Sequence, residues 1–137
     1  MSSISGQLRA MVVQRAGDRC EYCGLSQIGQ EATFHIDHIV PSSSADDDSP
    51  QNLALACVSC SLRKGSRQHL VDPQTQALVP IFNPRHDLWS DHFRWNGPYL
   101  VGVTPVGRAV VDGLSLNRPL IVAIRAEERE RGRHPAE

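Results

Sequence analysis

The sequences CEYCG at residues 20–24 and CVSC at residues 57–60 each place two cysteines three positions apart. Such a C-x2-C knuckle turns two thiolates toward one metal ion, and two knuckles complete a tetrahedral site. The knuckles use all four cysteines of the chain, which is a specific signal for a metal site. The sequence therefore predicts a structural zinc ion with four ligands: Cys20, Cys23, Cys57 and Cys60. Because four thiolates leave no open position on zinc, this ion is expected to hold the fold rather than to catalyse.

Residues 24–56, 33 in all, separate the two knuckles, and this gap is longer than in an ordinary zinc finger. Loop closure adds only about 0.6 kcal/mol per doubling of length, whereas structural zinc contributes roughly 10–16 kcal/mol in finger peptides. The gap therefore leaves the zinc prediction intact and provides room for a strand and a loop. Two disulfides or four buried thiols remain the alternative.

Length and composition set the other limits. A chain of 137 residues has room for one domain or for a small module with an extension. Aromatic residues make up only 5% of the chain, so a large core is not expected and a metal would help to hold the module. The formal net charge of −1 excludes binding to nucleic acid by bulk attraction, so any phosphate contact must come from a local patch.

Two observations predict a cytoplasmic protein without a membrane partner. No stretch approaches the length of a membrane span. The first 20 residues lack the charged start, long apolar stretch and cleavage site of a signal peptide. In a reducing compartment, paired cysteines bind metal more often than they form disulfides.

Apolar spacing and punctuation predict an α+β fold. Around the knuckles we expect a helix over 5–17 that is capped by Ser5, a strand over 32–40, a polar loop over 42–50 and a short helix over 58–67. We assign residues 1–70 to a core domain and residues 71–137 to a mixed α/β extension packed on it.

Within the extension, residues 72–75 and 83–85 carry turn residues, and residues 91–103 suit a hairpin around Asn96-Gly97-Pro98. Thr104 and Pro105 are typical of a helix start, and this helix is expected to continue through Leu114. A last helix opens at Pro119, and its charged end is expected to fray.

The segment between the knuckles carries the candidate chemistry, in the sequence HIDHIVP at residues 35–41 and in Asn52. Hydrolysis of a phosphodiester needs a base for water, a cation for the developing charge and a group that fixes the base. His38 is a natural base near neutral pH, and Asp37 is a hard ligand suited to Mg²⁺ or Mn²⁺. Asn52 would orient His38 or brace the loop. Because neighbours on a regular strand face opposite sides, the strand must twist or end here for both residues to share a site.

These motifs, with NLALACVSCSLRKG at residues 52–65, resemble the zinc-knuckle branch of the HNH endonucleases over roughly residues 18–67. The resemblance implies a ββα-metal core around one catalytic cation. It makes Asp37 a ligand of that cation, His38 the general base and Asn52 the central asparagine of the family signature. The third signature position, usually His or Asn, falls on Ser61.

Two features depart from the family pattern. A serine hydroxyl is a shorter and weaker ligand than imidazole or an amide, so Ser61 would bind the cation through water or another residue would compensate. The acidic loop at residues 45–48 stands where relatives often carry glycines, and we interpret it as a solvated loop, with a cation-holding role as the alternative.

Further residues of the sequence each suit two roles. His35 shares a strand face with Asp37 and is interpreted as a packing or hydrogen-bonding residue, with support of the metal as the alternative. No acidic residue occurs between Asp48 and Asp72, so three basic residues are predicted to contact phosphates unless they form a solvated face: Arg63, Lys64 and Arg67. A basic and aromatic cluster in the extension is interpreted as core rather than as a base-stacking surface: Arg85, His86, Trp89, His92, Arg94 and Trp95.

The sequence as a whole predicts a DNA endonuclease with structural Zn²⁺ and a catalytic Mg²⁺ or Mn²⁺. The alternative is a zinc-stabilised nucleic-acid-binding module with weak or no cleavage activity. A thiol redox protein is the third class, and the lack of a βαβ context around either knuckle argues against it.

Overall fold

A computed structural model describes residues 4–41 and 47–136. The chain divides into two compact units, residues 1–66 (unit 1) and residues 67–137 (unit 2). Over the described residues, short helices alternate with three two-stranded antiparallel sheets. This mixed architecture confirms the predicted α+β class.

Unit 1 begins with helix α1 (Gly6–Arg15). As predicted, Ser5 caps this helix, because its hydroxyl accepts a hydrogen bond of 3.1 Å from the Leu8 backbone N–H. Val12 is buried on the inner face of the helix. Arg15 donates to the Pro50 carbonyl at 2.9 Å and to the Leu53 carbonyl at 2.6 Å, which ties α1 to the sheet of the unit.

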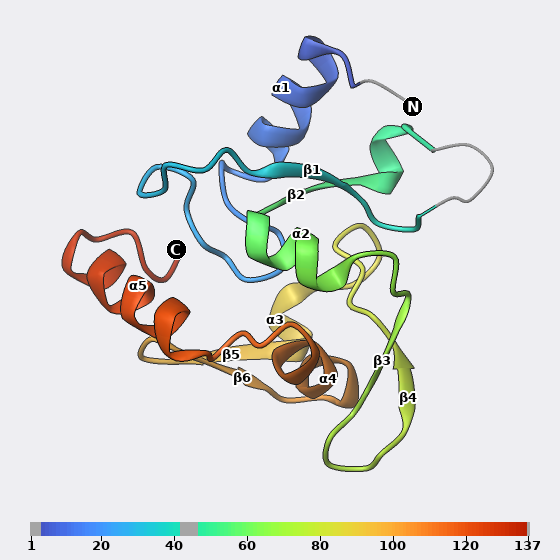
Figure 1. The fold of residues 1–137 in the computed structure, drawn as a ribbon, viewed down its shortest axis with the longest axis vertical. Helices are drawn as coiled ribbons and strands as arrows, with labels where there is room; N and C mark the ends of the chain where they lie inside the picture. The colour runs from blue at the N-terminus through green and yellow to red at the C-terminus, as the bar shows by residue number, and fades with distance from the viewer. Residues whose placement is uncertain (1–3, 42–46, 137) are drawn as a thin grey trace. The chain divides into compact units, whose positions relative to one another are not determined.

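Strand β1 (His35–His38) pairs with strand β2 (Leu53–Ala56), and helix α2 (Val58–Lys64) follows directly (Figure 1). The register places Asp37 opposite Ala54 and His38 opposite Leu53. This strand–strand–helix arrangement is the predicted ββα core.

Strand β1 is shorter than the strand predicted over 32–40. Its ladder ends at His38, and beyond it the Val40 N–H donates to the side chain of Asn52 at 2.9 Å. Residues 42–46 of the predicted polar loop lie outside the described residues. The chain then forms a short 3-10 helix, η1 (Pro50–Asn52), before it enters β2. Strand β2 itself was not predicted.

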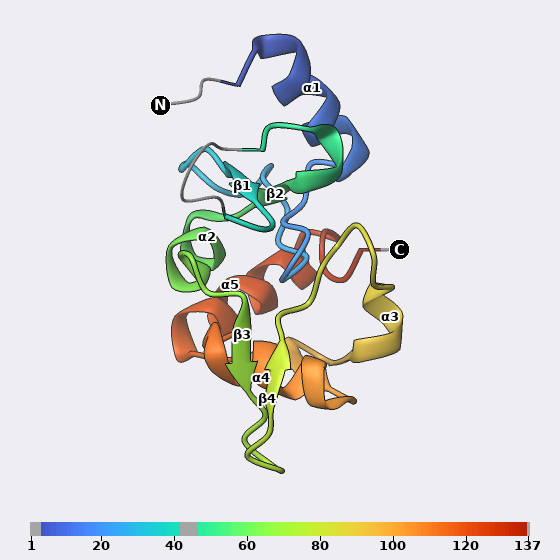
Figure 2. The same ribbon diagram turned by 90° about the vertical axis from the view of Figure 1, so that its right-hand side faces the viewer.

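Unit 2 contains two hairpins and three helices among its described residues. The hairpins join β3 (His69–Val71) to β4 (Leu78–Pro80) and β5 (Phe93–Asn96) to β6 (Tyr99–Gly102). The helices are α3 (Trp89–His92), α4 (Pro105–Gly113) and α5 (Pro119–Glu130). Figure 2 shows how β3 and β4 run together to their turn.

The hairpin predicted over 91–103 and the Thr104 cap are both confirmed. Gly97 turns the hairpin with a φ of 59°, and the Thr104 hydroxyl accepts from the Gly107 N–H at 3.0 Å. Gly102 also lets α4 approach β6, because a Cβ atom on this residue would overlap the backbone of Gly107 and Arg108.

Apolar side chains form the core of unit 2, and the aromatic residues of the predicted cluster pack within the unit. The rings of Trp89 and Phe93 lie 5.0 Å apart, and the Arg125 guanidinium lies 5.1 Å from the centre of the Trp95 ring. Arg94 and His86, two polar members of the cluster, are exposed.

The predicted fraying of the last helix is wrong. Helix α5 continues through Glu130, and the side chains of Arg125 and Glu128 are buried on its inner face. Arg133 closes the end of the helix, because its guanidinium donates to the Glu128 carboxylate at 2.7 Å. Burial and this ion pair order a segment whose composition alone indicated exposure.

Within residues 4–41 and 47–136, the helices are too short and too polar for any of them to traverse a lipid bilayer.

Candidate metal centre and cleft

The four cysteines converge in the interior of unit 1. All four are buried, none forms a disulfide, and their sulfur atoms lie within 4.8 Å of one another. The sulfur atoms of Cys23 and Cys57 are 3.8 Å apart. A tetrahedral zinc ion with Zn–S bonds of about 2.3 Å requires an edge of about 3.8 Å. The donor set and its size therefore fit zinc.

Backbone contacts build the two knuckles. Cys57 caps α2, and its sulfur accepts from the Cys60 N–H at 3.4 Å, while the Cys23 N–H faces the Cys20 sulfur at 3.5 Å. Between the first two cysteines, Glu21 exchanges two hydrogen bonds of 2.8 Å with the backbone of Leu55 in β2. The first knuckle is thus tied to the same strand that leads into the second.

The thiol pKa values show why this cluster needs a cation. Burial raises the pKa of Cys20 well above its usual range, and hydrogen bonds from neighbouring thiols, with Cys20 first, lower the pKa of Cys57. Four adjacent thiolates in a buried site are stable only when a positive ion balances their charge.

Asp37 is buried in a polar cluster with Tyr22 and Lys64. Its Oδ2 atom accepts a hydrogen bond of 3.0 Å from the Tyr22 hydroxyl and contacts the Lys64 ammonium at 3.1 Å. The Lys64 side chain is 0% exposed, and it also donates to the His38 carbonyl at 2.9 Å. Burial raises the pKa of Asp37, and the charge of Lys64 opposes this shift.

The second carboxylate oxygen of Asp37 faces different surroundings. Among the hydrogen bonds of the described residues, both contacts of this carboxylate fall on Oδ2. Asp37 also lines a cleft of about 690 Å³ between β1 and α2. Among the described residues, the Oδ1 atom has no hydrogen-bond partner.

His38 also lines this cleft, and its ring has a carboxylate partner. The Nε2 atom lies 2.7 Å from an Asp48 carboxylate oxygen, and both side chains are about three-quarters buried, at 24% and 29% exposed. Asp37 and His38 both line this cleft although they are neighbours in the same ladder, where they pair with Ala54 and Leu53. The strand ends directly after His38.

Asn52 braces the connection between the two strands. Its side chain accepts from the Val40 N–H at 2.9 Å and donates to the carbonyls of Val40 and Asp47 at 3.1 and 3.0 Å. These bonds position the residue that precedes Asp48. Of the two roles left open for Asn52, its contacts are those of a brace for the loop.

Ser61 faces the strand from α2. Its hydroxyl lies 3.0 Å from the Nδ1 atom of His35, and both residues line the cleft. The third signature position therefore contacts the histidine that precedes Asp37 by two residues.

Comparison with known proteins agrees with this geometry. Residues 20–67 match the family model described as HNH endonuclease, which begins at the first cysteine and ends just after α2. Residues 20–67 are an HNH domain. The match confirms the resemblance to the zinc-knuckle branch, and the family implies a nuclease or another activity on nucleic acids. No curated protein and no solved structure matches the chain.

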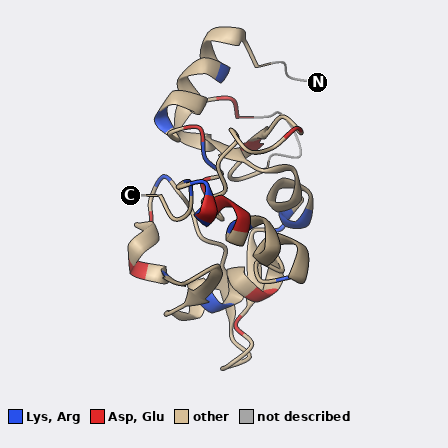
Figure 3. Ribbon diagram, turned by 90° about the vertical axis from the view of Figure 1, so that its left-hand side faces the viewer, with Lys and Arg blue, Asp and Glu red and all other residues tan. Residues whose placement is uncertain are grey.

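The three basic residues predicted to contact phosphates occupy different environments. Arg63 is exposed on α2 of the HNH domain, where its Nε donates to the Ser59 hydroxyl at 3.0 Å. Lys64 is buried against Asp37, away from solvent. Arg67 lies in unit 2 and donates to the Gly113 carbonyl at 3.1 Å. Basic and acidic residues are scattered along the ribbon, most of which is neither (Figure 3).

The sequence did not predict the role of Tyr22 or the inward direction of the Lys64 side chain. Tyr22 lies between Cys20 and Cys23, and only these two cysteines were predicted to have a role. Lys64 follows Cys60 by four residues, and side chains at this spacing share a helix face. Because Cys60 must point inward to the metal, this spacing was a usable signal for Lys64.

Over the described part of the chain, the cysteine cluster is the only group that brings three or more candidate metal ligands together. Among the described residues, a cation at Asp37 would therefore have at most two His, Cys, Asp or Glu ligands.

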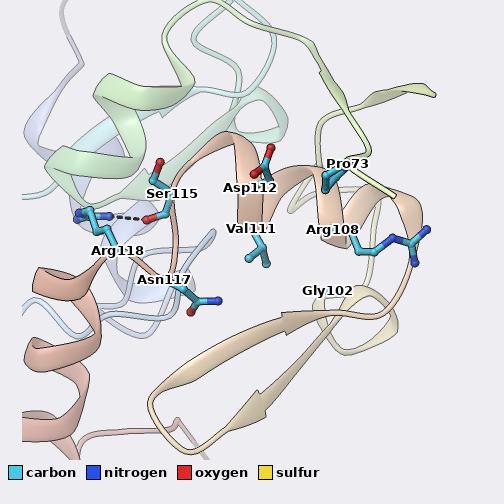
Figure 4. Close-up of a pocket in the computed structure, with 8 residues that line it drawn as sticks. All are labelled: Pro73, Gly102, Arg108, Val111, Asp112, Ser115, Asn117 and Arg118. Carbon is cyan, nitrogen blue, oxygen red and sulfur yellow. Dashed lines mark hydrogen bonds between the residues drawn. The ribbon is translucent and has the colours of Figure 1, made fainter. Parts of the chain in front are cut away.

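A second cleft, of about 480 Å³, lies in unit 2 beside α4 (Figure 4). Its arginines already serve the fold, because Arg108 pairs with Asp72 at 2.9 Å and Arg118 donates to the Ser115 carbonyl at 3.1 Å. The side chain of Asn117 likewise binds the backbone of Leu100 through two bonds of 2.8 Å. The lining contains one carboxylate, Asp112, and one hydroxyl, Ser115, but no His or Cys and no cluster of metal ligands.

Proposed function

We propose that the HNH domain is a metal-dependent endonuclease that hydrolyses phosphodiester bonds in DNA. The observation that carries this proposal is that Asp37 and His38 line one cleft although they are adjacent on a strand. A hard oxygen ligand and an imidazole base then face the same bound phosphate.

His38 acts as the general base in this proposal. When its Nε2–H donates to Asp48, the Nδ1 atom keeps a lone pair that accepts a proton from the attacking water. The carboxylate of Asp48 then stabilises the imidazolium that forms. Asn52 supports this pair indirectly, because it holds the Asp47 carbonyl.

Asp37 holds the divalent cation in the proposal, through Oδ1, the oxygen that neither Tyr22 nor Lys64 contacts. Tyr22 and Lys64 fix the other oxygen and so fix the direction of the carboxylate. When bound, Mg²⁺ or Mn²⁺ supplies positive charge against the scissile phosphate and the leaving 3′ oxygen. The zinc ion at the cysteines keeps β2 and α2 in place.

DNA is the proposed substrate and the cytoplasm the proposed location. Arg63 offers an exposed guanidinium on the helix that borders the cleft, where it would contact a flanking phosphate. The four cysteines form no disulfide, which supports a reducing compartment.

A zinc-stabilised module that binds nucleic acid without cleavage is the second candidate. Two observations favour it: the Lys64 ammonium already neutralises Asp37, and Ser61 replaces the usual His or Asn. Both features lower the affinity expected for a cation at Asp37.

Nicking of supercoiled plasmid in Mg²⁺, Mn²⁺ or Ni²⁺ distinguishes the two candidates. We expect nicking by the wild type and a loss of about 10²–10⁴ in rate for His38→Ala, because this is the usual contribution of a general base. The matched control is His86→Ala, which removes an exposed histidine of unit 2. All proteins must carry equal zinc. DNA binding without nicking in any of the three metals would favour the second candidate.

A further inference from the structure

We propose that His35, and not Ser61, supplies the nitrogen ligand of the divalent cation at Asp37, and that Ser61 orients the His35 ring. This inference rests on the proposed cation site, and it assigns new roles to two residues of the cleft. It accounts for the serine at the third signature position.

The strand places His35 beside Asp37. Residues two positions apart on a strand face the same side and lie about 6.6 Å apart along it. Small residues oppose both positions in the ladder, Ala56 opposite His35 and Ala54 opposite Asp37. Both side chains line the same cleft. An imidazole and a carboxylate at this spacing can converge on one ion, because each ligand atom lies about 2 Å from the metal.

The contact of Nδ1 with Ser61 leaves the other ring nitrogen of His35, Nε2, able to bind a metal ion. Nδ1 lies 3.0 Å from the Ser61 hydroxyl, so an Nδ1–H group can donate to that oxygen. The neutral ring then carries its lone pair on Nε2. Nε2 makes no hydrogen bond to any described residue. A histidine that binds a metal usually donates its other N–H to an oxygen in this way, which fixes the tautomer and the ring.

The chemistry explains the departure from the family pattern. The usual His or Asn at position 61 would reach the cation from the helix. Here the short Ser61 side chain instead meets the ring of His35, which brings the nitrogen from the strand. A set of one carboxylate and one imidazole binds Mn²⁺ and the later first-row ions better than Mg²⁺. Nitrogen ligation therefore predicts that Mn²⁺ binds more tightly than Mg²⁺.

Mn²⁺ binding to the full-length, zinc-loaded protein tests this assignment without any substrate. A titration followed by electron paramagnetic resonance gives the dissociation constant, and pulsed measurements detect ¹⁴N coupling from a bound imidazole. We expect one such coupling in the wild type. His35→Ala should abolish it and weaken Mn²⁺ binding by about tenfold or more, a loss of the size seen when metal sites lose a supporting group.

Five further variants locate the nitrogen. Ser61→Ala should keep the ¹⁴N coupling and weaken Mn²⁺ binding, because only the orientation of the ring is lost. His38→Ala and the unit 2 control His86→Ala should keep both the coupling and the affinity. Since His35→Ala removes a part-buried side chain, His35→Gln serves as a second variant that retains a polar group and should also lack the coupling. Asp37→Asn should abolish Mn²⁺ binding.

The outcomes separate this inference from the proposed function. Bound Mn²⁺ that depends on Asp37 but shows no ¹⁴N coupling, or coupling that survives in both His35 variants, overturns the ligand assignment. Plasmid nicking by the same wild-type protein would then leave the endonuclease proposal standing. Coupling that disappears with His35, in a protein that nicks no DNA, supports the ligand assignment and overturns the endonuclease proposal.

Discussion

The two units of the chain reach order by different means. Unit 1 contains two strands of four residues each. It also contains four buried thiols, two from residues 20–23 and two from residues 57–60. Both units bury apolar side chains, Phe34 and Leu55 among them in unit 1 and Phe82 and Leu100 in unit 2. Unit 2 contains none of the cysteines. We therefore expect unit 1, whose two knuckles meet at one ligand site, to depend on its metal, and unit 2 to be stable without one.

The ion pairs differ in the same sense. In unit 1, burial raises the pKa of Asp37 although Lys64 touches it. In unit 2, hydrogen bonds from Arg108 lower the pKa of Asp72, through contacts of 3.0 and 2.9 Å. The carboxylate at the candidate site is thus less stable in its charged form than usual, and the structural carboxylate is more stable. Perturbed carboxylates of the first kind are common where a ligand is to bind.

Removal of zinc should have the largest effect and should divide the units. Chelation, or Cys57→Ser, removes an ion whose binding contributes roughly 10–16 kcal/mol in small zinc domains. We expect peptides from residues 20–64 to lose their protection against hydrogen exchange. The chain has two tryptophans, Trp89 and Trp95, so tryptophan emission reports unit 2 and should stay unchanged.

Two results would contradict this difference between the units. Protection of β1 and β2 that persists after the zinc content falls to zero would show that unit 1 folds on apolar burial alone. A simultaneous shift of the tryptophan emission would show that unit 2 depends on the metal as well. Ser59→Ala, between the two cysteines of the second knuckle, is the matched control and should keep its zinc.

Lys64→Met should have the next largest effect. It leaves the Asp37 carboxylate buried without its cation, and breaking a buried ion pair in this way destabilises proteins by about 3–5 kcal/mol. Hydrogen exchange of unit 1 measures the loss. Mn²⁺ should restore more stability to this variant than to the wild type, because the metal replaces the missing charge at Asp37.

The control for Lys64→Met lies in unit 2. Arg131→Met breaks an exposed pair with Glu127, at 2.9 Å on α5, and exposed pairs contribute only about 0–1 kcal/mol. Equal losses of stability in the two variants would mean that burial of Lys64 does not strengthen its ion pair with Asp37. The two units would then not differ in the strength of their ion pairs.

The sequence predicted those parts of the fold that local signals encode. The two knuckles, the caps at Ser5 and Thr104 and the turn at Gly97 each depend on neighbours within a few residues. The residues of strand β2 were not predicted to form a strand, because all four are buried. The strand therefore shows no alternation of polar and apolar positions.

The candidate site was harder to predict than the fold because its contacts cross the chain. Four residues that line the cleft were named from the sequence, but their partners were not: His35, Asp37, His38 and Ser61. Asp48 reaches His38 across ten residues through a loop, and Lys64 meets Asp37 only because α2 turns that face toward the strand. Side-chain direction at these positions depends on tertiary packing, which composition does not encode.

Asp48→Asn should lower the nicking rate by about tenfold, as the loss of a carboxylate that orients a functional group does in other sites. The amide keeps the size of the side chain but lacks the charge that supports His38 as it accepts a proton. Asp47→Asn is the control, because the Asp47 carboxylate caps the Ser49 N–H in the same loop at 2.9 Å.

A double-mutant cycle decides whether Asp48 acts through the histidine. In a His38→Ala background, Asp48→Asn should have no further effect on the residual rate. A loss of equal size in both backgrounds would assign Asp48 to the loop alone and remove it from the proposed mechanism.

The smallest effect concerns the pH dependence of unit 2. Arg108 lowers the folded pKa of Asp72, so the ionised carboxylate stabilises unit 2 at pH values above the unfolded Asp pKa of about 3.9. This contribution is lost as pH falls from there through the lower folded value. The melting temperature reported by tryptophan emission should therefore fall between pH 5 and pH 3.

Two variants test this pH dependence. Asp72→Asn should have a lower melting temperature than the wild type at pH 5, and its melting temperature should fall less on acidification. Asp91→Asn, at an exposed position of α3, should show the same change of melting temperature with pH as the wild type. If Asp72→Asn kept the wild-type change of melting temperature with pH, the ion pair with Arg108 would not determine the acid sensitivity of unit 2. The two units would then not differ in how their carboxylate ion pairs affect stability.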